Sequence, residues 1–182
     1  MIPFYNLKKI NSKLKKEFNY AFRKFIDKGH YVGGPELQTF ENEFADYCGS
    51  KYSIGVGNGL DALKIILRAY MEIGKFKVND EIIVPANTYI ATILSITENQ
   101  LNPILVEPAI KDYNLNPILI ESKITSKTKA IMIVHLYGQL ADVKSIKKIA
   151  KKYNLLVIED SSQAHGAEID GTKAGNWGHA SG

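Results

Sequence analysis

The sequence predicts an α/β fold, in which a mostly parallel β-sheet is covered by helices on its faces. Two features of the 182 residues lead to this prediction. Short apolar runs alternate along the chain with longer segments in which apolar residues recur at helical spacing. The runs are apolar throughout, without alternating polar residues, as expected for strands that are covered on both faces.

The N-terminal part, residues 1–35, is expected to form an arm made of a helix and a loop. Four apolar side chains recur every three or four residues and predict an amphipathic helix over residues 11–28. They are Leu14, Phe18, Phe22 and Phe25. The sequence Gly33-Gly34-Pro35 then interrupts the helical pattern.

Residues 36–182 are expected to form one domain. Its predicted strands cover residues 52–56, 81–85, 104–106, 130–134 and 155–159. Its predicted helices cover residues 36–48, 60–73, 88–98, 116–123 and 142–153. The glycine-rich tail from Gly166 is expected to form strands and turns, and we expect no closing helix or strand at the end of the chain.

Composition and charge narrow the class of protein. The net charge is +4 and the isoelectric point is about 9.0, but the lysines are spread over helix faces, so we expect no nucleic-acid partner. No run of about twenty apolar residues predicts a membrane span, and the N-terminus lacks the pattern of a secretory signal. The single cysteine, Cys48, excludes a disulfide framework and is expected to be a buried thiol. These features predict a cytoplasmic protein without a membrane partner.

The segment Gly57–Leu63 joins a predicted strand to a predicted helix. Glycines let the backbone approach an anion, and the N-terminus of a helix offers free N–H groups. Two interpretations stay open: a phosphate cradle, or a glycine turn in which Asn58 caps the helix. A dinucleotide site is disfavoured because Leu60 stands where the G-x-G-x-x-G motif requires its third glycine.

Polar and aromatic side chains follow two further predicted strands. Tyr89 stands where a helix begins, and its ring either faces a planar cofactor or packs in the core. The last predicted strand delivers Glu159 and Asp160, followed by Gln163 and His165, into one loop. A carboxylate in that place can form a charge-assisted hydrogen bond to a protonated ring nitrogen.

Two alternatives remain for the Asp160 carboxylate. One is a metal site that Asp160 shares with His165 and His135, although the five-residue separation of Asp160 and His165 differs from the usual spacing on a zinc-binding helix. The other is a structural carboxylate that caps the next turn.

These segments also resemble a known family. Together with Val134-His135-Leu136-Tyr137-Gly138-Gln139 and Gly33-Gly34-Pro35-Glu36, they are similar in order and spacing to the DegT/DnrJ/EryC1/StrS sugar aminotransferases. The likeness extends from Ile2 to Gly182. It implies the large domain of the type I, aspartate-aminotransferase fold, of which residues 36–182 form an incomplete part. It also implies that pyridoxal 5'-phosphate is the cofactor and that the smaller C-terminal domain is absent.

The resemblance implies a role for each matching residue. The turn formed by Asn58, Gly59, Leu60 and Asp61 holds the phosphate. Tyr89 stacks on the pyridine ring, Asp160 pairs with its nitrogen as the catalytic partner, and Gln163 bonds its hydroxyl group. The residues expected to support this set from outside are His135, Tyr137 and His165. No metal is implied.

The most similar enzymes of the family aminate a 3-keto-6-deoxyhexose carried on dTDP. This implies a nucleotide-sugar substrate, glutamate as amino donor, a homodimer, and a place in the synthesis of O-antigen, lipopolysaccharide or other glycans. The family's Schiff-base lysine is expected beyond Gly182, because Lys173 matches the glycine-rich hairpin instead. The chain alone is therefore expected to be inactive. Two alternatives are a sugar dehydratase of the same family, with histidine in place of the lysine, and a non-catalytic remnant that binds a partner.

Overall fold

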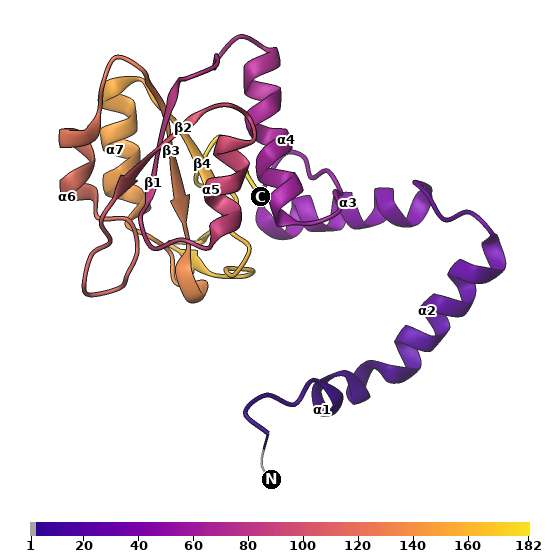
Figure 1. The fold of residues 1–182 in the computed structure, drawn as a ribbon. Helices are drawn as coiled ribbons and strands as arrows, with labels where there is room; N and C mark the ends of the chain where they lie inside the picture. Colours follow the sequence, from indigo (N-terminus) through magenta and orange to yellow (C-terminus); the bar gives the residue numbers. More distant parts are fainter. Residues whose placement is uncertain (1–2) are drawn as a thin grey trace. The chain divides into compact units, whose positions relative to one another are not determined.

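Figure 1 shows the computed structural model of the chain, which describes residues 3–182; the start of the resemblance at Ile2 lies outside the described residues. The chain divides into two compact units, Met1–Asn42 and Glu43–Gly182. The division falls inside helix α3 (Pro35–Cys48), whereas the sequence places the end of the arm before this helix. From Glu43 onward α3 belongs to the second unit, and Ala45 is buried.

The first unit is helical. It contains α1 (Leu7–Asn11), the 3-10 turn η1 (Ser12–Leu14) and α2 (Lys15–Lys28), so the helix predicted over residues 11–28 begins earlier and includes a tighter turn. Gly29 ends α2 in the left-handed conformation, with φ of 63°. No residue of α2 is buried.

The second unit is built on five parallel strands in the order β2-β1-β3-β4-β7. Their bounds are β1 Glu81–Pro85, β2 Asn102–Val106, β3 Thr128–Val134, β4 Leu156–Asp160 and β7 Ala180–Ser181. Two further short strands, β5 (Glu168–Ile169) and β6 (Thr172–Lys173), form an antiparallel hairpin in the glycine-rich tail. The parallel sheet predicted from the uninterrupted apolar runs is confirmed.

Helices connect the strands and cover both faces of the sheet (Figure 1). Their bounds are α4 Gly59–Glu72, α5 Ile90–Thr97, α6 Pro117–Ile120, which continues into the 3-10 turn η2 Glu121–Lys123, and α7 Val143–Tyr153. Ile82 and Val84 pack into the core beneath α4 and α5, while Ile83 packs into the opposite core, beneath α6 and α7. Successive residues of a strand therefore enter different cores, which is why each run is apolar without alternation. Within residues 3–182, no helix combines the length and apolar character needed to span a lipid bilayer.

The strand predicted over residues 52–56 is absent. No strand of the described residues pairs with this segment, and Tyr52 and Ile54 are 74% and 79% exposed. Residues with a high tendency to form strands need a neighbouring strand to pair with, and the sequence pattern does not say whether one is present.

A closing strand, which the sequence did not indicate, is present. Although β7 is only two residues long, it pairs with β4, and the segment is fixed by hydrogen bonds from His179 N to Val157 O at 2.7 Å and from Gly182 N to Glu159 O at 2.9 Å. Two residues are too few to show a periodic pattern, so this strand is visible only in the structure.

Replacing Gly178 with alanine is expected to destabilise the fold. The added Cβ atom would lie 2.7 Å from the backbone oxygen of Val157, and a backbone atom in a parallel sheet cannot move aside cheaply. We expect a loss of about 1–3 kcal/mol in the free energy of unfolding, measured in urea. Gly57→Ala is the control, because its Cβ atom would meet only the flexible carboxylate of Asp61. Equal stability of the two variants would contradict this account of Gly178.

Candidate functional site

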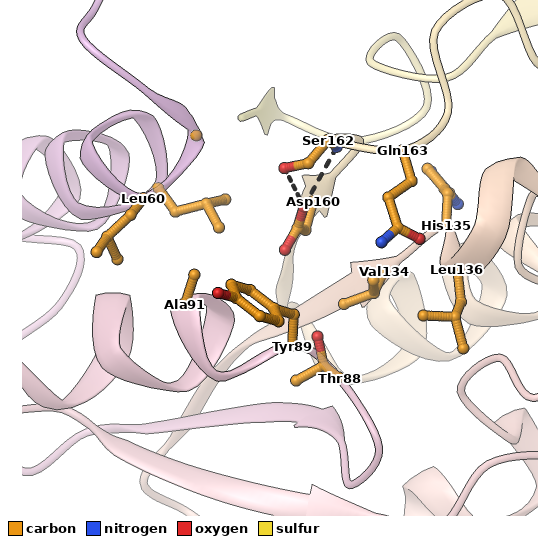
Figure 2. A pocket seen from close by; sticks show the side chains of 12 residues that line it. Leu60, Thr88, Tyr89, Ala91, Val134, His135, Leu136, Asp160, Ser162 and Gln163 are labelled. Atoms are coloured by element: carbon orange, nitrogen blue, oxygen red, sulfur yellow. Dashed lines mark hydrogen bonds between the residues drawn. The ribbon is translucent and has the colours of Figure 1, made fainter. Parts of the chain in front are cut away.

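The topology of the sheet places a cavity at the carboxyl ends of its strands. After β1 the chain forms β2 on one side of it and then β3 on its other side. The direction of winding therefore reverses between the neighbouring strands β1 and β3. Ligands of open parallel sheets bind at such a reversal. The cavity found there is lined mainly by residues that follow β1, β3 and β4 and by the start of α4 (Figure 2). The lining includes Gly59, Leu60, Tyr89, Asp160, Ser162 and Gln163.

Asp160 places a buried carboxylate at the cavity. It is the last residue of β4 and faces the same side of the sheet as Ile158, toward α4 and α5, with an exposed fraction of 7%. Its Oδ2 atom accepts a hydrogen bond from the hydroxyl of Thr92 at 2.7 Å. Its Oδ1 atom accepts one from the hydroxyl of Ser162 at 2.7 Å (Figure 2). Both oxygens are held. Oδ1 also accepts the Ser162 N–H at 3.3 Å, while Oδ2 keeps a lone pair for another partner.

The Asn58–Asp61 turn combines the two interpretations that the sequence left open. The Oδ1 atom of Asn58 accepts the N–H of Asp61 at 2.9 Å, and its Nδ2 atom donates to the Asp61 carboxylate at 2.8 Å, so Asn58 caps α4. The N–H groups of Gly59 and Leu60, in the first turn, have no acceptor within the helix. Gly59 and Leu60 line the cavity while Asn58 and Asp61 bind each other outside its lining. An anion bound here would meet backbone N–H groups and the positive end of the helix dipole.

Tyr89 stands at the mouth of the cavity. It precedes the first residue of α5, and its side chain is 72% exposed, so it is not a core residue. Figure 2 shows the Tyr89 ring near the Asp160 side chain among the residues that line the cavity. The ring is free to contact a flat ligand.

Gln163 is oriented by the backbone of the turn after β3. Its Oε1 atom accepts the N–H of Tyr137 at 2.7 Å, so its amide nitrogen is left as the donor. Tyr137 has a positive φ of 55° and an 83% exposed side chain, so its backbone contacts Gln163 while its ring points away. Gly138 lies close behind, where a Cβ atom would be 3.1 Å from the backbone oxygen of Gln163.

The sequence suggested that Glu159 and Asp160 enter the same loop. In the structure Glu159 does not. Adjacent residues of a strand face opposite sides of the sheet, so Glu159 is fully buried on the α7 side. It binds the Nε2 atom of His135 at 2.9 Å and accepts backbone N–H groups of the glycine-rich tail. These come from Gly175 at 2.9 Å, Trp177 at 2.8 Å and Gly178 at 2.6 Å. Burial raises the pKa of Glu159, but the hydrogen bonds from His135 and the tail outweigh it and hold the pKa below its ordinary value.

His135 is fixed by the same network. Its Nδ1 atom accepts the N–H of Ala141 at 3.2 Å, so its Nε2 atom carries the proton toward Glu159. His135 lies at the edge of the cavity but has both ring nitrogens occupied. His165 is exposed and packs against the ring of Phe44, with 5.9 Å between centroids. The metal site left open by the sequence is therefore not assembled from these residues, and no other cluster of three possible ligands occurs within residues 3–182.

Three further residues, Lys173, Cys48 and Thr92, do not line the cavity. Lys173 lies in β6 and donates to the backbone oxygen of Tyr47 at 2.7 Å, while its Nζ atom lies over the Tyr47 ring. Cys48, expected to be buried, is half-buried, and this burial raises the pKa of its thiol. Thr92, which the sequence did not single out, is the residue that touches the Asp160 carboxylate from within the helix layer.

Comparison with known proteins matches this arrangement to one family. Residues 12–182 match the DegT/DnrJ/EryC1/StrS aminotransferase family. The chain belongs to this family. The resemblance that the cavity segments suggested is thereby confirmed, and so is the fold class.

Two curated relatives are named as transaminases of dTDP-linked aminosugars. The chain is 56% identical over its whole length to dTDP-3-amino-3,6-dideoxy-alpha-D-galactopyranose transaminase of Aneurinibacillus thermoaerophilus, covering 49% of that protein. It is 41% identical, over 96% of its length, to dTDP-3-amino-3,4,6-trideoxy-alpha-D-glucose transaminase of Streptomyces venezuelae, covering 45% of that protein. The chain thus spans about half the length of the curated relatives that it matches.

Solved structures share the fold. DesV of S. venezuelae, solved in complex with a ketimine intermediate, superposes with a TM-score of 0.91 at 40% identity, covering 96% of this chain and 46% of that one. The E. coli GDP-4-keto-6-deoxy-D-mannose-3-dehydratase with bound hydrated PLP gives a TM-score of 0.84 at 28% identity, covering 88% and 42%. The fold of this chain is therefore shared by DesV and by a dehydratase.

Proposed function

We propose that the chain forms the cofactor-binding part of a pyridoxal phosphate-dependent aminotransferase of nucleotide-linked keto-deoxysugars. The observation that carries the proposal is the buried Asp160 carboxylate, which opens onto a cavity bordered by an exposed aromatic ring and the start of a helix. Membership of the aminotransferase family supports it. In this proposal residues 36–182 are an incomplete large domain and residues 1–35 are an arm.

The donors and acceptors of the cavity fit the chemical groups of pyridoxal phosphate. The open N–H groups of Gly59 and Leu60 suit its phosphate. The Tyr89 ring suits its pyridine face, the Asp160 carboxylate its protonated nitrogen, and the Gln163 amide N–H its ring hydroxyl oxygen. When bound, the cofactor supplies a cationic ring that withdraws electrons from the substrate carbon.

The residues of this chain act by holding the ring and its charge. Because Thr92 and Ser162 already solvate Asp160, its negative charge is fixed in place before any ligand arrives. His135, Tyr137 and Gly138 stabilise the turn that orients Gln163. No lysine lines the cavity within residues 3–182, so we propose that the amine that moves the proton comes from outside this segment.

The substrate and the context belong to the proposal as well. The name of the relative of 56% identity supports a dTDP-linked 3-keto-6-deoxyhexose as amino acceptor. We propose glutamate as the amino donor. We further propose a homodimer, a cytoplasmic location and a role in supplying aminosugars for glycans such as O-antigen and lipopolysaccharide. The single cysteine of the sequence is in keeping with a reducing compartment.

The test is an assay of the full-length protein loaded with pyridoxal phosphate, given glutamate and a dTDP-linked 3-keto-6-deoxyhexose. The proposal expects a dTDP-linked aminosugar and one equivalent of 2-oxoglutarate, identified by mass spectrometry. Release of a deoxygenated sugar without incorporated nitrogen would indicate the dehydratase instead. Absence of any reaction and of any bound cofactor would favour a non-catalytic protein.

A further inference from the structure

A buried hydroxyl in α5 contacts the Asp160 carboxylate from outside the cavity. Thr92 has an exposed fraction of 0% and does not line the cavity. Its hydroxyl reaches across to β4 and donates to the Oδ2 atom of Asp160 at 2.7 Å. A carboxylate can only accept, so the direction of this hydrogen bond is determined.

The hydroxyl of Thr92 is itself held by a second threonine. The Oγ1 atoms of Thr88 and Thr92 lie 2.7 Å apart. Because Thr92 gives its proton to Asp160, Thr88 must donate to Thr92. The result is a directed chain from Thr88 through Thr92 to the carboxylate.

This geometry differs from the usual behaviour of a threonine inside a helix, where the hydroxyl bonds a carbonyl of the preceding turn. Thr97 in the same helix does so, at 3.3 Å from the backbone oxygen of Ile93. Thr92 instead contacts a residue 68 positions later in the chain. The hydroxyl of Thr92 therefore bonds a distant carboxylate, while that of Thr97 bonds its own helix.

The Asp160 carboxylate is held on both sides. Thr92 bonds Oδ2, while the hydroxyl of Ser162 bonds Oδ1 at 2.7 Å and the Ser162 N–H approaches it at 3.3 Å. Two hydrogen bonds on different oxygens prevent the carboxylate from rotating about its bond to Cβ. The remaining lone pairs then have a fixed direction, which a ring nitrogen needs for a charge-assisted hydrogen bond.

We propose that Thr92 is a positioning residue that orients the Asp160 carboxylate toward the ring nitrogen of the cofactor. The inference rests on the proposed function, since it requires a bound pyridine ring. Thr92 contributes through Asp160 alone and has no contact with the ligand. Its hydroxyl matters for ligands that carry a ring nitrogen and is neutral for those that lack one.

The experiment compares two probes on the full-length protein without bound cofactor. One probe is pyridoxal phosphate, and the other is its deaza analogue, in which a C–H group replaces the ring nitrogen. Equilibrium dialysis gives Kd for each probe with the wild type, Thr92→Val, Thr92→Ser and Thr97→Val. Valine keeps the shape of threonine without its hydroxyl, serine keeps the hydroxyl, and Thr97→Val makes the same chemical change elsewhere in α5.

We expect Thr92→Val to raise Kd for pyridoxal phosphate roughly tenfold, as for the loss of one hydrogen bond to a charged group, with Kd for the deaza analogue unchanged. Thr92→Ser and Thr97→Val should bind both probes as the wild type does. An equal loss of affinity for both probes would overturn the proposal, because it would show an effect on the shape of the cavity. Wild-type affinity of Thr92→Val for pyridoxal phosphate would overturn it as well.

Three further outcomes are decisive. If Thr92→Val does not fold, Thr92→Ala also removes the hydroxyl, and the same selective loss is expected; an unselective result or none overturns the proposal. If the wild type does not bind pyridoxal phosphate, the proposed function fails together with this inference. If the wild type binds it and the variants bind it equally well, only the role of Thr92 fails.

Discussion

Replacing Asp160 with asparagine is expected to reduce kcat of the full-length enzyme by roughly 10²–10³-fold, the range observed when one preorganised electrostatic partner of a transition state is lost. Asparagine keeps the size of the side chain and an oxygen for one of its two hydroxyl donors, Thr92 and Ser162. It removes the negative charge that keeps the ring nitrogen protonated. The measurement is steady-state kinetics with saturating cofactor, so that weaker binding does not contribute.

The matched control is Asp170→Asn. Asp170 is exposed, pairs with Lys144 on the surface, and has a positive φ of 51° that asparagine tolerates. Its replacement should leave kcat unchanged. An Asp160→Asn enzyme with the kcat of the wild type would show that the carboxylate is structural, which is one of the alternatives that the sequence leaves open.

Replacing Glu159 with glutamine is expected to lower the free energy of unfolding by about 3 kcal/mol, as when one partner of a buried pair is removed. The Oε2 atom of Glu159 faces two donors, the Gly175 N–H and His135 Nε2. In glutamine an amide NH₂ group would replace Oε2, so a donor would face these two donors. The hydrogen bonds from the Trp177 and Gly178 N–H groups to Oε1 would be kept. Urea unfolding at neutral pH measures the difference.

The effect depends on pH in a defined direction. The pKa of Glu159 lies below its ordinary value of 4.5, so its stabilising contribution is complete above that value and is lost as the pH falls below it. The stability gap between the wild type and Glu159→Gln should therefore narrow below about pH 4.5. Glu121→Gln, which alters exposed contacts with Lys152 and with the Tyr153 hydroxyl, is the control and should show little change at neutral pH. A gap that stays constant on acidification would contradict the ionised network.

Much of the fold could be predicted because its core strands are buried on both faces. The runs Ile82-Ile83-Val84 and Ile131-Met132-Ile133 are apolar in every position, and each lies in a central strand. Residues 52–56 contain the strand-forming Tyr52, Ile54 and Val56 but have no strand partner within residues 3–182, and β7 is too short to carry a pattern. Strand pairing joins segments that are far apart in the chain. A prediction from local sequence therefore fails where pairing alone determines whether a segment forms a strand.

The site was predictable where the topology itself gathers residues. The carboxyl ends of parallel strands lie at the same edge of a sheet. This arrangement brings together Tyr89, Asp160 and Gln163, which lie at or after such strand ends. The sequence was less clear about which side of the sheet each side chain faces. Glu159 lies on the α7 side because successive residues of a strand face opposite sides. The role of Thr92 could not be predicted from the sequence. The sequence does not indicate whether the hydroxyl of a threonine in an apolar helix bonds a carbonyl of that helix or a distant carboxylate.

The central claim is that the cavity at the ends of β1, β3 and β4 holds pyridoxal phosphate with its ring nitrogen on Asp160. A crystal structure of the full-length protein grown with pyridoxal phosphate tests this directly. The account predicts the ring nitrogen at about 2.7–2.9 Å from a carboxylate oxygen of Asp160, with the phosphate on the N–H groups of Gly59 and Leu60. A cofactor bound with its nitrogen turned away from Asp160, or bound elsewhere, would contradict it.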